Sequence, residues 1–119
     1  MNQSGVLLPL KERTAAAKSA DQLNLHGTSV RVRTVATVVT SGASLVVKIQ
    51  GKDAGGNYYD ILTDAAITSA SDSTLLVSPW TTAATNERAV DMLPRYWRVV
   101  ATPADTKAIT YAVYYDTDG

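Results

Sequence analysis

The sequence predicts an all-β fold, an antiparallel β-sandwich or small barrel with an extended N-terminal arm. From residue 28 onward, apolar and polar side chains alternate with the period of two that is typical of half-buried strands. Turn-forming residues interrupt this alternation about every 8 to 12 residues, as in small sandwiches. No segment after residue 27 is long enough and suitably patterned for a helix. These observations favour one domain built from short strands.

Residues 1–27 are expected to form the arm, and residues 28–119 the sandwich domain. The triplet Ala15-Ala16-Ala17 favours a helix, but no apolar stripe is present that such a helix would bury. We therefore interpret this segment as extended, with residues 14–19 as a candidate edge strand. Because it lacks an apolar face, we expect it to serve assembly more than folding, so that its deletion would leave a folded core.

The first part of the domain predicts two strands followed by a hairpin. Residues 30–39 and 45–50 alternate, and Ser41-Gly42-Ala43 separates them. The stretch Ala54-Gly55-Gly56-Asn57 then predicts a tight turn into a strand at 58–63.

The middle of the domain predicts shorter elements. Strands are expected at 66–69 and 74–78, separated by a turn at Ser71-Asp72-Ser73, where small polar side chains bond to their own backbone. Pro79 ends the second strand. Residues 79–94 form a mainly irregular loop, and loops of this length in small domains often carry function.

A final hairpin is predicted from residues 95–102 and 109–115. Trp97 lies on the alternating face of its first strand and is expected in the core. Tyr111 and Tyr115 share one face of the second strand, and Tyr114 lies on the other. Such tyrosines form either a stacking platform for sugars or bases, or a cover over the core edge, and we expect the cover.

Composition excludes several classes of function. Eleven basic and eleven acidic side chains cancel, so no overall field favours nucleic acid or an anionic membrane. The absence of cysteine excludes disulfides and thiolate chemistry. The apolar run Val6–Leu10 is short and contains a proline, so it is neither a signal peptide nor a membrane span. Residues 1–33 carry a charge of +3 and residues 105–119 a charge of −2, so the two ends could pair within or between subunits.

Catalytic and metal-binding residues are sparse. His26 is the only histidine, and it lies in a turn-like segment without a nucleophile motif. Asp53, Asn57 and Asp60 surround the hairpin turn but lack the ligand pattern of a calcium loop. We therefore expect no enzyme activity, no cofactor and a fold that needs no metal.

Five segments resemble, in order and spacing, the head decoration (cement) proteins of tailed bacteriophages, which are small β-sandwich virion proteins. These segments are Leu8–Thr14, Leu45–Asp53, Tyr58–Leu62, Leu93–Val99 and Ile109–Val113. The chain is more charged than that pattern at Lys11–Ala20. The resemblance implies a protein that is made in the host cytoplasm, binds the outer surface of a capsid and stabilises it. Its partners would be the major capsid protein and further copies of itself, in a trimer.

The arm and the long loop are the surfaces expected to contact neighbours. Trp80 either folds back as a plug or stands out as an interface anchor. The candidate contact residues are Leu7, Leu8, Leu10, Lys11, Arg13, Lys18, Trp80, Glu87 and Arg88. Two alternatives remain open: a phage tail or neck structural protein, and a carbohydrate-binding β-sandwich module that uses Trp80 and the terminal tyrosines.

Overall fold

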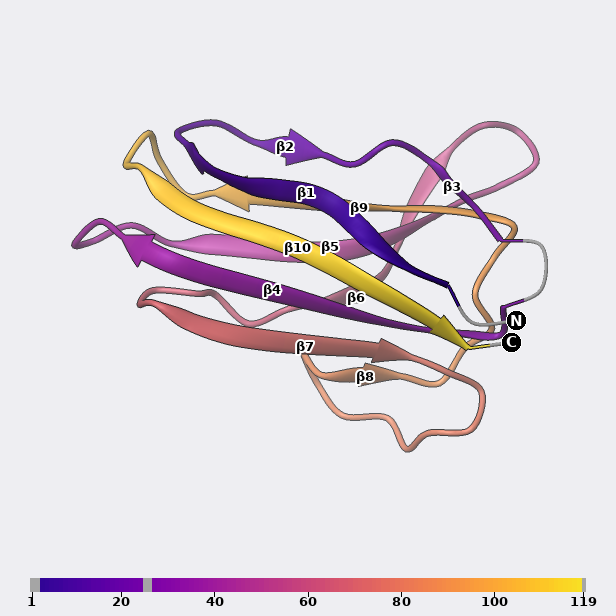
Figure 1. Ribbon diagram of the computed structural model, residues 1–119. Coiled ribbons are helices and arrows are strands. Elements are labelled where there is room, and N and C mark those ends of the chain that lie inside the picture. Colours follow the sequence, from indigo (N-terminus) through magenta and orange to yellow (C-terminus); the bar gives the residue numbers. More distant parts are fainter. Residues whose placement is uncertain (1–2, 25–26, 119) are drawn as a thin grey trace.

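The protein is a sandwich of two β-sheets (Figure 1). The computed structural model describes residues 3–24 and 27–118, so His26 lies outside the described residues. Within these ranges every regular element is a strand, and the molecule measures 40 × 29 × 22 Å. Both sheets are open, which confirms the predicted sandwich and excludes the small barrel.

The first sheet contains five strands and is antiparallel except for its last pair, β7 and β8. In spatial order its strands are β1 (Gln3–Arg13), β10 (Ile109–Asp118), β4 (Ser29–Val39), β7 (Ser71–Val77) and β8 (Arg88–Ala89). Successive side chains of the central strand β4 point to opposite faces of the sheet. Val30 and Val32 are therefore buried, while Arg31 and Arg33 point to the outer face. One face of this sheet therefore forms the core and the other remains exposed.

The second sheet has the order β2-β9-β5-β6, and β3 also pairs with β9. Its strands are β2 (Ala17–Lys18), β3 (Gln22–Leu23), β9 (Tyr96–Pro103), β5 (Leu45–Lys52) and β6 (Tyr58–Thr63). The predicted glycine hairpin joins β5 to β6. An oxygen of Asp53 accepts bonds from the backbone amides of Gly55 and Asn57, each at 2.9 Å. Gly56 has a φ of +85°, a conformation that glycine adopts without steric cost.

The core lies between the two sheets and contains the predicted aromatic residues. Trp97 is 1% exposed, and its ring meets that of Tyr115 edge to face at a centroid distance of 5.4 Å. Tyr111 is also buried, whereas Tyr114, on the opposite face of the same strand, is 39% exposed. The predictions for Trp97 and for the two faces of the last strand are confirmed.

The N-terminal segment is extended, as expected, but it is not separate from the sandwich. β1 pairs with β10 from Gln3 to Arg13, and the side chains of Leu7 and Leu8 are buried. The expectation that this segment lacks an apolar face is wrong. The register shifts between Val6 and Leu8, so the two adjacent leucines both turn inward and break the period of two. Residues 14–19 contribute only the short β2, which pairs with β9.

Two further predictions need correction in the middle of the chain. Ser71-Asp72-Ser73 does not form a turn but begins β7, because it pairs with β4 and thereby satisfies its backbone in the sheet. Residues 66–69 do not form a strand, and Ile67 makes a single bridge to Leu45. The loop 79–94 is mainly irregular, as predicted, apart from β8.

Candidate functional site

The structure places two of the candidate contact residues in the interior. Leu7 and Leu8 are 7% and 6% exposed, so they do not contact a partner while the sandwich is intact. Arg13 is half-buried, and its guanidinium donates to the carbonyl oxygens of Pro9 at 2.7 Å and Tyr111 at 2.9 Å. These three residues hold β1 in place.

The exposed candidates fall into two separate groups. Leu10, Lys11 and Lys18 lie on β1 and β2, which are neighbouring edges of the two sheets (Figure 1). Leu10 is 57% exposed, and neither lysine forms an ion pair within the described part of the chain. We call these three residues the β1–β2 patch.

Trp80 belongs to the second group, in the loop between β7 and β8. Its side chain is 81% exposed, so the alternative of a folded-back plug is wrong. Its backbone is nevertheless held in place. The Trp80 amide donates to Oγ of Ser78 at 3.1 Å, and that hydroxyl is 2.9 Å from the Ser29 hydroxyl on β4, which donates to it. The amide of Ser78 donates to the carbonyl of Ala89 and so closes the base of the loop.

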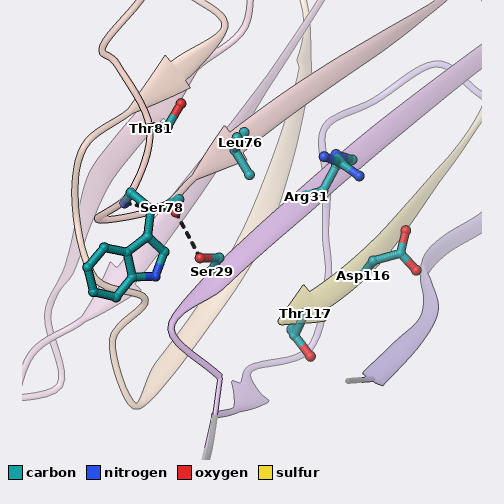
Figure 2. A pocket seen from close by; sticks show the side chains of 8 residues that line it. Ser29, Arg31, Leu76, Ser78, Thr81, Asp116 and Thr117 are labelled. Carbon is teal, nitrogen blue, oxygen red and sulfur yellow. Dashed lines mark hydrogen bonds between the residues drawn. The ribbon is translucent and has the colours of Figure 1, made fainter. Parts of the chain in front are cut away.

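An open hollow of about 500 Å³ lies beside Trp80, on the outer face of the first sheet (Figure 2). It is lined by Ser29, Arg31, Leu76, Ser78, Trp80, Thr81, Asp116 and Thr117. Arg31 and Asp116 are register partners on β4 and β10, and both are exposed. The two side chains form no ion pair, with each other or with any other described residue. At this position, the charged ends that could pair within one subunit do not do so.

A second hollow, of about 270 Å³, continues from the first and shares Arg31 and Leu76 with it. Its remaining lining residues include Glu87 and Arg88. Three of the predicted contact residues thus line the two hollows, Trp80 the first and Glu87 and Arg88 the second. We call the two hollows together the Trp80 groove. Sequence reasoning missed Asp116, because its approach to Arg31 depends on the pairing of strands that lie far apart in the chain.

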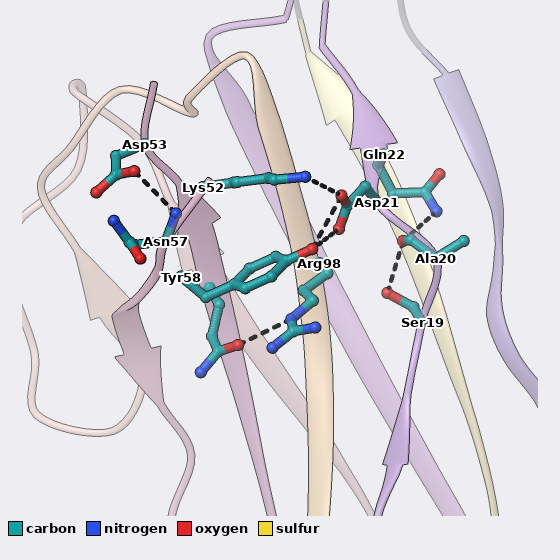
Figure 3. Close-up of polar contacts among 10 residues, drawn as sticks. Ser19, Ala20, Asp21, Gln22, Lys52, Asp53, Asn57, Tyr58 and Arg98 are labelled. Atoms are coloured by element: carbon teal, nitrogen blue, oxygen red, sulfur yellow. Dashed lines mark hydrogen bonds and ion pairs between the residues drawn. The ribbon is translucent and has the colours of Figure 1, made fainter. Parts of the chain in front are cut away.

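The outer face of the second sheet carries a polar network (Figure 3). Tyr58 donates its hydroxyl proton to the carboxylate of Asp21 at 2.8 Å, and Nζ of Lys52 lies 3.1 Å from the same group. The guanidinium of Arg98 lies over the Tyr58 ring, 3.4 Å from its centroid. The hydrogen bonds from Tyr58 and then Lys52 lower the pKa of Asp21. Since these polar groups are already paired with one another, we interpret the network as structural: it attaches the segment around Asp21 to the second sheet.

The described residues contain no group of three or more side chains suited to a metal ion. Of the carboxylates near the hairpin turn, Asp53 bonds to its own turn and Asp60 accepts from Gln50 and Lys48. No helix that could cross a membrane is present in the part of the chain that the structure describes.

Asp64 is a buried carboxylate at the crossing from β6 to β7, where the hydroxyl of Ser73 donates to it. Burial raises its pKa, and the bond from Ser73 opposes this effect only in part. The folded state therefore disfavours the charged form. Stability from this group is greatest at a pH below the ordinary value of 3.8 and is lost as the pH rises through the raised pKa.

We expect Asp64→Asn to raise the melting temperature at pH 7, because the amide removes the buried charge and keeps an acceptor for Ser73. The difference from the natural protein should disappear as the pH falls below about 4, where Asp64 is itself neutral. Thermal melts from pH 3 to 8 test this, with Asp72→Asn as an exposed control. An Asn variant that is less stable at pH 7 would contradict the assignment.

Comparison with known proteins relates the chain to others by fold alone. No protein-family model matches the sequence, and no curated protein is significantly similar to it. Several solved structures share the fold, among them the following three, each matched over 90% or more of this chain. They are the PBSX exported protein XepA (TM-score 0.63, 12% identity), a mutant VP2 protein of infectious bursal disease virus in T=1 particles (0.59, 10%) and the CBM22-1–GH10 modules of a Clostridium thermocellum xylanase (0.51, 13%).

The first two alignments include 98% of this chain, and the third includes 90% of it. It spans only 37%, 31% and 20% of the respective proteins. In each case the chain aligns with one part of a longer protein, and the likeness shows a shared all-β fold.

Proposed function

We propose that this chain is a structural virion protein that decorates and stabilises a phage capsid by binding its outer surface. The observation that carries the proposal is the sandwich itself, whose fold recurs in a VP2 protein that forms T=1 particles. The resemblance of five sequence segments to phage decoration proteins supports the same role. The major capsid protein is the proposed partner, and the virion surface is the proposed location.

We propose the β1–β2 patch as the contact with the shell. Exposed Leu10 supplies apolar area, and Lys11 and Lys18 offer two cations that have no carboxylate partner among the described residues. A shell surface with an apolar depression and nearby carboxylates would complement this patch. Repetition over the shell would strengthen a modest contact, and a homo-oligomer, proposed as a trimer, would fit the threefold positions of a capsid.

The test is to mix the purified protein with capsids that lack it. We expect saturable binding at a copy number comparable with that of the shell protein, together with greater resistance to heat. The double variant Lys11→Glu/Lys18→Glu should bind at least about tenfold more weakly at low salt, with a smaller loss at high salt.

The matched control is Arg95→Glu/Lys107→Glu, which makes the same change in charge at exposed positions outside both the patch and the Trp80 groove and should bind normally. Equal losses in both double variants would contradict the proposed contact surface. A copy number of about a dozen or fewer would favour the tail or neck alternative, and the absence of any binding would overturn the proposal.

A further inference from the structure

We propose that the Trp80 groove is a binding site for a neutral oligosaccharide, with the indole of Trp80 as a stacking platform. Arg31 and Asp116 would provide the hydrogen bonds that orient the sugar. This activity is separate from attachment to a shell and does not rest on it, because the groove and the β1–β2 patch share no residue.

The platform is a solvent-exposed indole. Trp80 is 81% exposed, whereas the other tryptophan, Trp97, is 1% exposed. The backbone bond to Ser78 fixes the start of the loop, so little conformational entropy is lost at this backbone when a ligand binds. A pyranose ring has an apolar face of C–H groups and a rim of hydroxyls. Such a ring matches a flat apolar surface with polar side chains beside it.

The charges beside the platform favour a neutral ligand. Arg31 supplies only donors and Asp116, when ionised, only acceptors, and neither has an ion-pair partner in the described ranges. The two opposite charges cancel, so the hollow offers no net charge that would select a cationic or an anionic ligand. Hydroxyl groups both donate and accept, and can therefore satisfy both side chains. Arg33, two residues along the same strand, shows the contrast, because its guanidinium is already paired with Asp72.

The second hollow extends the site along the sheet. Beyond the shared Arg31 and Leu76, it adds one cation and one anion, Arg88 and Glu87. The first hollow, at about 500 Å³, lies within the range of about 300 to 1,000 Å³ that is usual for small-molecule sites. A ligand that occupies both hollows must be longer than one sugar unit. We therefore expect hexasaccharides to bind more tightly than the corresponding monosaccharides.

Tryptophan fluorescence provides the test, since one indole is exposed and the other is buried. The probes are xylohexaose, cellohexaose and maltohexaose, with oligogalacturonate and chitosan oligomers as charged counterparts. We expect at least one neutral hexasaccharide to shift the emission saturably and to protect Trp80 from quenching by acrylamide. The charged oligomers should bind more weakly than the best neutral one.

Trp80→Ala should weaken binding by about tenfold or more, as truncation of a central aromatic contact usually does. Arg31→Ala and Asp116→Asn should each weaken it as well. The control is Tyr59→Ala, which removes an aromatic side chain that is 44% exposed on the other sheet and should leave sugar binding unchanged. Binding measured by calorimetry provides a second readout for the Trp80 variant.

Two results would overturn the proposal. The first is that none of the neutral hexasaccharides binds at concentrations up to about 10 mM. The second is that they bind equally well to Trp80→Ala. If no sugar binds and Trp80→Ala also abolishes attachment to capsids, Trp80 is instead an anchor for a protein partner.

Discussion

Deletion of residues 1–13 is expected to abolish the cooperative folded state. These residues include the whole of β1, which covers one edge of β10 and places Leu7 and Leu8 in the core. Removal of a buried leucine side chain typically costs about 2 to 5 kcal/mol. Two such losses approach the total stability of a small domain, about 5 to 15 kcal/mol, before the lost strand pairing is counted.

Far-ultraviolet circular dichroism and urea unfolding of the truncated chain provide the measurement. The point variants Leu8→Ala and Leu10→Ala form a matched pair, because Leu8 is 6% exposed and Leu10 is 57% exposed on the same strand. We expect a loss of about 2 to 5 kcal/mol for Leu8→Ala and less than about 0.5 kcal/mol for Leu10→Ala. A truncated chain with a normal unfolding transition would show that β1 is dispensable and would restore the interpretation of a separate arm.

The N-terminal segment shows where the alternation of apolar and polar residues is no longer sufficient to predict a strand and its buried face. Alternation identified the central strands, because β4 and β5 bury every second residue over most of their length. It failed for β1, since the register shift at Leu7 and Leu8 puts adjacent leucines on the same side. It also failed at Ser71–Ser73, where small polar side chains fit a turn as well as the exposed start of a strand.

The candidate site was predictable only in part, and for a physical reason. A tryptophan directly after Pro79, in a long loop, indicated either a folded-back plug or a contact residue. In the structure Trp80 is the most exposed of the large hydrophobic side chains described, which rules out the plug. Its neighbours Arg31 and Asp116 meet only because β4 and β10 pair in one specific register. The network of Asp21, Tyr58 and Lys52 likewise depends on tertiary contacts. A one-dimensional pattern does not record such contacts.

Trp97→Ala is expected to lower the free energy of unfolding by about 3 to 5 kcal/mol, the usual cost of emptying a large aromatic site in a core. Trp97 is 1% exposed and lies in the core between the two sheets, where its ring contacts that of Tyr115. Its strand, β9, pairs with β2, β3 and β5, so little backbone movement can fill the cavity. Urea unfolding followed by circular dichroism measures the loss.

Trp80→Ala is the matched control, because the same substitution at an 81% exposed side chain should cost less than about 0.5 kcal/mol. A loss below about 1 kcal/mol for Trp97→Ala would mean that the two sheets can close over the missing indole, and that packing in this sandwich is far less specific than its alternating strands imply.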